Sequence, residues 1–497
     1  MADISGNAKA QPVGKFVIVA LAMGQVLVSL DATAMNIALP TVQNDLGASS
    51  SSLQLIIVSY MIASAACTLP IAAISDRVGR KRMYTGGLLG FIFGSGLCAI
   101  AWSTQILVIA RVIQGIGAAA IFGLALAILT ANVDRARVPK IVAVWMTVST
   151  VAFSAGPFVG GVLVSLFGWR SVFFINMPLT VLVLTVAVAA LPNDRKIINE
   201  RPNLTGGVLI ALTLSMFTWA IISIQQSGFM SPQVLLSFLF SCVLLAVLIF
   251  EQRHTDDPLV QWDLLKRSPI PASLALNLLL GLALSGAQYQ MSIFTQNVLG
   301  YSAALAGTIT LSATVMMAAL APVAPKLQYR LGAARPAMIA FLITGLGMLL
   351  LGMSNPSSTI SWIVLGLSVL GIGLAIADPI VSSVAMQNAE ESNAGAVSGS
   401  LGLMGQVGAT LGITLMGGLT TSVALSHWHS GNGDPVLDTL VGVGDVSGVE
   451  ARGGKMAREL AATAYSSGVS VTLTAGAIVM TVSGLVALAL LPRKPVN

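Results

Sequence analysis

Long apolar runs recur along the whole of this 497-residue chain and constrain its fold more than any other feature. Each run holds about 18 or more mostly apolar residues, enough for a helix that crosses a hydrocarbon layer about 30 Å thick. Only 9% of the residues are charged, against about 25% in ordinary soluble proteins. So few ionic groups would not cover a water-facing surface. The sequence therefore predicts an all-α polytopic membrane protein.

Fourteen of these runs are predicted to be transmembrane helices, which places both chain ends on the same side. Their ranges are 16–39, 53–74, 83–102, 105–130, 140–165, 171–191, 205–226, 232–250, 270–298, 303–326, 336–354, 360–387, 395–425 and 469–491. Of the 25 Lys and Arg residues, 20 fall on the side of the N-terminus, one (Arg111) lies within a span, and four fall on the far side. Because cytoplasmic loops are enriched in Lys and Arg, both termini are predicted to be cytoplasmic.

Sequence echoes about 250 residues apart indicate an internal duplication. The motif QGIGAAAIFG in the fourth span matches LGIGLAIADP in the twelfth, DRVGRK matches YRLGAARP, and GPFVGG matches GQVGATLG, in the same order. The predicted organisation is a six-helix bundle over 1–195, two inserted helices over 196–268, and a second six-helix bundle over 269–497. The second bundle carries a long outer loop, 426–468, whose latter part is predicted to form an amphipathic helix. This loop either caps the vestibule or is a tolerated insertion.

Three charged side chains fall in the interior of predicted spans, away from the span ends: Asp31, Arg111 and Asp378. A charge at membrane depth is costly and marks a functional position by default. Asp31 and Arg111 are expected to pair, either as a proton-coupling site or as a purely structural ion pair. Asp378 is expected either to couple protons or to sit at a cavity mouth near the end of its helix. The three Cys residues show no pairing or metal spacing, and no metal or cofactor is expected.

Five motifs in the sequence resemble those of the major facilitator superfamily: LDATAMNIALP, DRVGRKR, RVIQGIGAAA, GPFVGG and FTQNVLGYSAALAG. Together with fourteen spans, they resemble its drug:proton antiporter branch with fourteen helices, which includes quaternary-ammonium and multidrug exporters. The resemblance implies the major facilitator fold, with two six-helix bundles and two inserted helices. It also implies a multi-pass protein of a bacterial cell membrane.

Two of these motifs have expected mechanical roles. In DRVGRK, Gly79 permits a tight turn, and the motif is expected to act as a conformational latch or as a plain positive-inside anchor. Its residues are Asp76, Arg77, Gly79, Arg80 and Lys81. In GPFVGG, Pro157 removes a backbone hydrogen bond and the glycines allow close approach of a neighbouring helix. The resemblance implies an antiporter motif that controls leak, and ordinary close packing is the alternative; its residues are Gly156, Pro157, Gly160 and Gly161.

The predicted function is proton-coupled efflux of hydrophobic, cationic drugs or biocides by alternating access, conferring multidrug or antibiotic resistance. Expected partners are this small molecule, protons and lipid, with no nucleic acid, and the protein is expected to act as a monomer rather than as an enzyme. The alternative is a dedicated exporter of one antibiotic, metabolite or lipid. Residues expected to contact the substrate are Asp31, Tyr60, Trp145, Gln288, Tyr289, Phe294 and Gln296.

Overall fold

The computed structural model describes residues 15–131, 152, 155–191, 204–227, 231–255, 269–388, 394–431 and 433–493. Within these ranges every regular element is a helix, as the sequence predicts. Trp145 and most of the predicted fifth span lie outside the described residues, and so do the side chains of Asp76 and Arg77.

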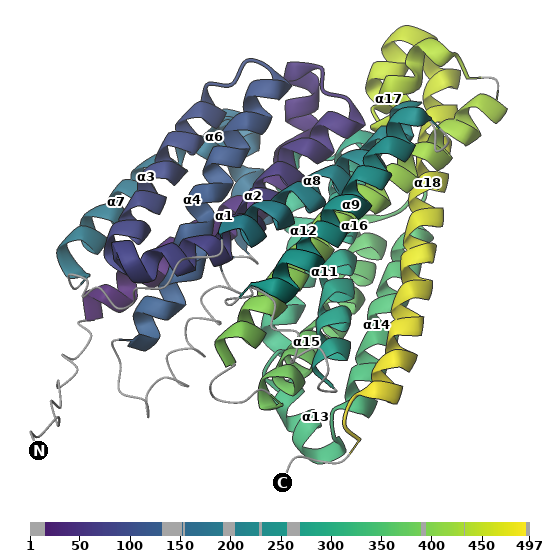
Figure 1. Cartoon of the computed structure of the whole chain (residues 1–497). Coiled ribbons are helices and arrows are strands. Elements are labelled where there is room, and N and C mark those ends of the chain that lie inside the picture. Colours follow the sequence, from purple (N-terminus) through teal and green to yellow (C-terminus); the bar gives the residue numbers. More distant parts are fainter. Residues whose placement is uncertain are drawn as a thin grey trace, which may run out of the picture.

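Long helices run between two ends of the molecule (Figure 1). α1 begins and α18 ends at one end, called here the termini end, and α17 lies at the other, called the α17 end. The described helices are α1 (Lys15–Leu46), α2 (Ser50–Val78), α3 (Arg80–Ala99), α4 (Thr104–Ala131), the helix Ala155–Phe167, α6 (Ser171–Phe174), α7 (Asn176–Ala190), α8 (Leu204–Ser227), α9 (Pro232–His254), α11 (Ile270–Ile293), η2 (Phe294–Val298), α12 (Ala303–Leu320), α13 (Val323–Leu331), α14 (Ala334–Gly352), α15 (Ile360–Gln387), α16 (Ala394–Ser430), η3 (Pro435–Leu437), α17 (Asp438–Gly442) and α18 (Val446–Leu490).

Each of the fourteen predicted spans overlaps one of these helices. Eleven helices in the described part are long and apolar enough to cross a membrane. The helix over 155–167 and the stretch 205–217 within α8 are apolar but shorter. α3 is not among the eleven. The molecule is therefore an all-helical, multi-pass membrane protein, while the count of fourteen stays a prediction.

The described helices form two groups joined by α8. Helices α1 to α7 pack on one another and are called here the N-terminal group, and α11 to α18 form the C-terminal group. α8 lies against α2 of the first group and α16 of the second, and α9 packs on α8. Close contacts hold this pair in place: a Cβ on Gly207 would clash with the Pro70 ring, and the Ser241 hydroxyl donates to the Thr213 carbonyl.

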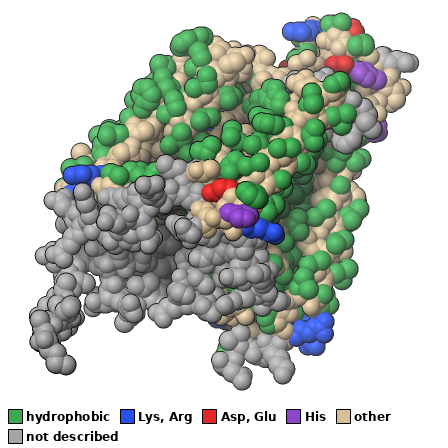
Figure 2. All heavy atoms as spheres, in the orientation of Figure 1, with side chains coloured by type: hydrophobic (Ala, Val, Ile, Leu, Met, Phe, Trp, Pro, Cys, Tyr) green, Lys and Arg blue, Asp and Glu red, His purple; other side chains and the backbone are tan. Residues whose placement is uncertain are grey.

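The sides of the helices present apolar side chains outward, while charged side chains gather near helix ends (Figure 2). α9 is the extreme case, because Leu236, Leu239 and Phe250 are each more than half exposed. Such exposure is disfavoured in water and expected in lipid, since hydrocarbon tails are as apolar as leucine. The outward apolar faces therefore fit a chain surrounded by a bilayer.

The two helix groups are in direct contact at the α17 end. The Ser292 hydroxyl donates to the Asn36 carbonyl at 2.6 Å, and the Asn297 amide donates to Gln43 Oε1 at 3.1 Å. The backbone N–H of Ala304 donates to Ser165 Oγ at 3.0 Å. All three bonds join an N-terminal helix to a C-terminal helix near this end, so the molecule is closed there.

The predicted outer loop 426–468 is largely helical, because α16 runs on to Ser430 and α18 starts at Val446. A helix covers its second half as expected, and the backbone breaks only at Gly454, where φ is 79°. The amphipathic pattern predicts one apolar face with Met456, Leu460 and Ala464. This prediction is wrong at Met456, which is 87% exposed, while Ala464 is buried. Asn297 of η2 also donates to the Val443 carbonyl, which joins this segment to η2 at the α17 end.

Candidate functional site

Asp31 and Arg111 form a buried ion pair inside the N-terminal group. Arg111 Nη1 lies 2.7 Å from Asp31 Oδ2, and neither side chain is exposed. Both residues sit on long apolar helices, α1 and α4, where an unpaired charge would be strongly destabilising. The structure therefore confirms the expected pairing of Asp31 with Arg111. Its role in proton coupling stays a prediction.

Two amide side chains complete the surroundings of Asp31. Gln114 Nε2 and Asn176 Nδ2 donate to Asp31 Oδ1 at 3.0 and 2.6 Å. Gln114 lies one turn after Arg111, accepts from Arg111 Nη1 at 2.5 Å, and donates to Ser95 Oγ of α3 at 2.8 Å. Asp31 therefore only accepts hydrogen bonds, which is the pattern of a carboxylate rather than a carboxylic acid. Four helices, α1, α3, α4 and α7, meet at this one group.

Arg111 is held by aromatic rings as well as by Asp31. Its guanidinium carbon lies 4.1 Å from the centroid of the Tyr60 ring and 5.8 Å from that of Phe173. Nε donates to the Ile56 carbonyl at 3.4 Å, while Nη2 is buried with no hydrogen-bond partner. A buried guanidinium with an unused donor can change partners when the surrounding helices shift.

Gln114 and Asn176 are the site residues that sequence reasoning missed. Both are polar side chains within apolar spans, and such residues often hydrogen-bond between helices. Asn176 opens α7 directly after the interruption at Ile175 that separates it from α6. In the sequence, Pro178 in the motif INMP was the signal that could have indicated a helix start at Asn176.

Asp378 lies apart from this cluster, in the C-terminal group on α15. Its Oδ1 accepts from Asn277 Nδ2 of α11 at 3.1 Å. None of the ion pairs among the described residues includes Asp378, and its side chain is partly exposed. The structure thus places the two intramembrane carboxylates in different helix groups, with Arg111 beside only one of them.

The turn expected at Gly79 is present between α2 and α3. Gly79 has φ 112°, a conformation that residues with a Cβ rarely adopt, so glycine is required at this turn. Lys81 Nζ donates to the Leu191 carbonyl at 2.8 Å, which ties the start of α3 to the end of α7. Arg80 lies at the first position of α3. The expected latch to Asp76 or Arg77 concerns side chains outside the described residues and stays a prediction.

The GPFVGG helix sits where the two groups touch. A Cβ on Gly156 would clash with Thr33, and one on Gly160 would lie 2.7 Å from the Ala34 Cβ, both on α1. A Cβ on Gly161 would lie 2.5 Å from the Ala303 carbonyl oxygen of α12. The Pro157 carbonyl in turn leaves no room for a side chain at Gly307. These small residues let one helix contact α1 and α12 at once.

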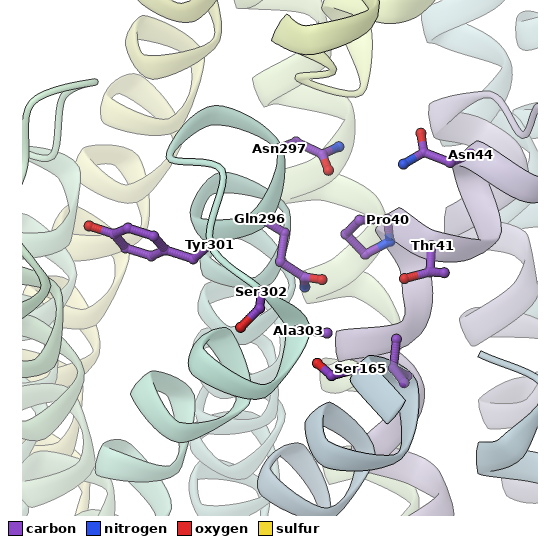
Figure 3. A pocket seen from close by; sticks show the side chains of 10 residues that line it. Pro40, Thr41, Asn44, Ser165, Gln296, Asn297, Tyr301, Ser302 and Ala303 are labelled. Carbon is purple, nitrogen blue, oxygen red and sulfur yellow. The ribbon is translucent and has the colours of Figure 1, made fainter. Parts of the chain in front are cut away.

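A cavity of about 360 Å³ opens beside this contact at the α17 end (Figure 3). Side chains from both helix groups line it, and none of them is charged: Pro40, Thr41, Asn44, Val164, Ser165, Gln296, Asn297, Tyr301, Ser302 and Ala303. Figure 3 shows the Gln296 side chain extending toward Thr41 across the cavity. Hydroxyl and amide groups predominate, so the cavity suits water or uncharged polar groups.

The residues expected to contact substrate do not come together in one pocket. Gln296 lines the cavity at the α17 end, Tyr60 stacks on Arg111, and Phe294 is fully buried. Gln288 and Tyr289 are each 3% exposed, and Gln288 Nε2 has no hydrogen-bond partner. Asp31 is 1% exposed, and Arg111, Gln114 and Asn176 donate to its two oxygens. Direct contact between Asp31 and substrate stays a prediction.

Comparison with known proteins decides the family. A family model described as Major Facilitator Superfamily matches residues 21–413. This chain belongs to the major facilitator superfamily. The fold agrees: a solved bacterial homolog of the human lysosomal transporter Spinster, inward-facing and unoccupied, superposes with a TM-score of 0.70. It is 18% identical in sequence, and the match covers 96% of this chain and 97% of that one.

Several curated relatives of this superfamily member are resistance and export proteins. The Multidrug resistance protein Stp of Mycobacterium tuberculosis is 28% identical over 425 residues, covering 85% of this chain and 78% of that protein. The Tetracenomycin C resistance and export protein of Streptomyces glaucescens is 30% identical over 416 residues, covering 82% and 76%. The superfamily is one of transporters, which favours transport over catalysis.

Proposed function

We propose that this chain is a proton-coupled efflux transporter that exports hydrophobic, cationic drugs or biocides by alternating access. The buried Asp31–Arg111 pair carries the proposal, because it joins a titratable carboxylate to a fixed positive charge within a superfamily of transporters. Relatives named for multidrug resistance and for tetracenomycin C export support drugs as cargo. The chain acts as a monomeric transporter without a cofactor, not as an enzyme.

In the proposed cycle, protonation of Asp31 releases the helices that meet at its carboxylate. Neutralising Asp31 removes its attraction for Arg111 and weakens the three hydrogen bonds that its oxygens accept, because bonds to a charged acceptor are the stronger ones. The contacts among α1, α4 and α7 then weaken, and Arg111 moves toward other partners. Proton loss restores the pair, so the proton and the arrangement of these helices are linked.

The proton gradient supplies enough free energy for concentrative export. One charge moving through 100 mV yields about 2.3 kcal/mol, and each pH unit adds about 1.4 kcal/mol. About 1.4 kcal/mol corresponds to a tenfold concentration ratio. Exchange of one proton for one monovalent cation moves no net charge, so it supports a cargo gradient of about tenfold per pH unit, and each further proton per cycle adds both terms.

We further propose that the α17 end faces outward and that both termini are cytoplasmic, on the basis of the Lys and Arg distribution. In this orientation the conformation described above is closed to the outside. The DRVGRK turn would act as a latch at the cytoplasmic end, and the GPFVGG helix would hold the outer closure. Cargo would enter from the cytoplasmic side.

Substitution of Asp31 tests the proposed coupling. In inverted vesicles, the wild type is expected to accumulate a fluorescent cation after a pH jump, and a protonophore should abolish this uptake. Asp31→Asn is expected to exchange the cation down its own gradient but to lose the response to the pH jump. Ser237→Ala on α9 serves as the control and should behave as the wild type, because the lost hydroxyl donates to the Gln233 carbonyl of the same helix. A full pH response in the Asp31 variant would remove this carboxylate from the mechanism.

A second candidate function is export of one dedicated antibiotic. Other relatives favour it: the Methylenomycin A resistance protein of Bacillus subtilis is 28% identical over 429 residues, and the Probable actinorhodin transporter of Streptomyces coelicolor is 29% identical over 401 residues. Toxicity profiling in a host without its own efflux pumps separates the two functions. A multidrug exporter protects against several unrelated compounds, and a dedicated one protects against a single compound.

A further inference from the structure

Asp378 is an intramembrane carboxylate that the proposed proton cycle does not use. It lies nine residues before the end of α15, which at about 1.5 Å per residue places it about 13 Å from the helix terminus. An ionisable group at this depth is energetically unfavourable unless it is paired or faces a polar cavity. No Lys or Arg pairs with it among the described residues, so its charge is not compensated from within that part of the protein.

Asn277 presents an unused acceptor beside this carboxylate. Its Nδ2 is committed to Asp378 Oδ1, and its Oδ1 is buried without any hydrogen-bond partner. The residue is only 9% exposed. A buried polar atom without a hydrogen-bond partner destabilises the protein. The hydrogen bond orients the amide so that the donor faces Asp378 and the oxygen remains available for a different donor.

The helix that faces this oxygen carries no side chain at the point of contact. Gly405 of α16 lies next to it, and a Cβ at that position would stand 3.1 Å from Asn277 Oδ1. Ser273, one turn earlier on α11, adds a buried hydroxyl without a partner. Asp378, Asn277 and Ser273 thus carry acceptor oxygens near one another, where α11 packs with α15 and α16. Asn277 Oδ1 and Ser273 Oγ have no hydrogen-bond partner.

The contrast with Asp31 separates the two carboxylates by chemistry. Asp31 is neutralised by Arg111 and saturated by three N–H donors, so an incoming cation meets neither net charge nor a free oxygen there. Asp378 accepts a single hydrogen bond and keeps its negative charge available. A carboxylate with a neighbouring amide oxygen matches a protonated amine, which brings both a positive charge and N–H donors.

We propose that Asp378 and Asn277 form the binding site for the cationic group of the cargo, and that this site favours protonated amines over quaternary ammonium ions. Asp378 supplies the countercharge for either kind of cation, and Asn277 Oδ1 accepts a hydrogen bond that only an N–H donor can provide. The inference rests on the proposed export function and adds the cargo's chemical class and its anchoring residues.

A matched pair of ligands tests the site: a lipophilic tertiary amine, protonated at neutral pH, and its N-methylated quaternary analogue. Their dissociation constants are measured on the purified full-length protein in lipid nanodiscs at a fixed pH. Asp378→Asn is expected to weaken binding of both ligands at least tenfold, and Asp378→Glu should restore most of it. Asn277→Leu should weaken binding of the tertiary amine about tenfold and change that of the quaternary analogue less than twofold.

Two controls and three possible outcomes make the test decisive. Ser237→Ala should bind both ligands as the wild type does, and thermal unfolding should confirm that each variant is folded. Equal losses for both ligands in Asn277→Leu would overturn the preference for N–H donors. Unchanged binding in Asp378→Asn, while the wild type still shows proton-driven transport, would overturn the inference and leave the proposed function standing. A wild type that shows no transport in vesicles would overturn the proposed function itself.

Discussion

Asn176 supports Asp31 from a third helix, and this contact gives a stability prediction at the scale of one residue. The asparagine is 3% exposed, and its 2.6 Å hydrogen bond ends on a charged oxygen. Hydrogen bonds to charged groups contribute about 1.5–3 kcal/mol. Asn176→Leu is therefore expected to lower the free energy of unfolding by this amount, measured by denaturant titration in detergent. Ser237→Ala should change it by less than about 0.5 kcal/mol, and an equally small loss for Asn176→Leu would show that Asp31 does not depend on this donor.

The pairing of Asp31 with Arg111 was predictable from the sequence because a charge within a membrane span must find a compensating charge. Only one basic residue lay in the interior of the predicted spans, so the choice of partner was narrow. Gln114 and Asn176 were not predicted, since many amide side chains in membrane helices meet only backbone or neighbouring turns. Which of them reaches Asp31 depends on the rotation of α4 and α7, and the apolar pattern of these helices does not fix that rotation.

At the scale of helices, apolar length predicted where helices occur but not how far they continue beyond the membrane. α1 extends seven residues past the predicted boundary at 39, and α18 begins 23 residues before the predicted boundary at 469. Charged residues such as Asp45 and Glu459 fit these helix extensions because water replaces lipid beyond the predicted boundaries. A hydropathy boundary therefore marks the edge of the bilayer rather than the end of a helix.

The glycines of GPFVGG give a prediction for helix contact. Gly161→Ala is expected to push the helix Ala155–Phe167 away from α12, because the new Cβ would lie 2.5 Å from the Ala303 carbonyl oxygen. The closure at the α17 end should then open more often. Ser292 is buried at this contact between the two groups. A cysteine in its place should react several times faster with a membrane-impermeant maleimide in the Gly161→Ala variant than in the protein that keeps Gly161.

Gly86→Ala is the matched control for this experiment, because nothing lies within 4 Å of the added Cβ. The background protein carries replacements of Cys67, Cys98 and Cys242, so that only the introduced thiol reacts. Equal labelling rates in the Gly161 and Gly86 variants would show that the close contact with α12 does not hold the α17 end shut.

For the whole molecule, the sequence predicted an all-helical superfamily fold but not a single cluster of substrate residues. Tyr60, Gln296 and Phe294 all lie in predicted apolar spans, yet the structure places them apart. Tyr60 lies beside Arg111, Gln296 lines the cavity at the α17 end, and Phe294 is buried in the core. Depth along a helix is readable from the sequence, whereas the side of the helix that faces the partner group depends on how the two groups meet. That arrangement differs between the states of a transporter, so one sequence pattern cannot describe it.

Alternating access requires the two helix groups to separate at the α17 end, and a covalent link across them should therefore stop transport. Ser165 Oγ accepts from the backbone N–H of Ala304 at 3.0 Å, so cysteines at these two positions lie within reach of a disulfide. In the background without native cysteines, Ser165→Cys with Ala304→Cys is expected to lose proton-driven uptake after mild oxidation and to regain it after reduction. Each single variant should be insensitive to the oxidant. If the oxidised double variant still transports at the wild-type rate, with the crosslink confirmed by mass spectrometry, the contact between these helices persists throughout the cycle and opening occurs elsewhere.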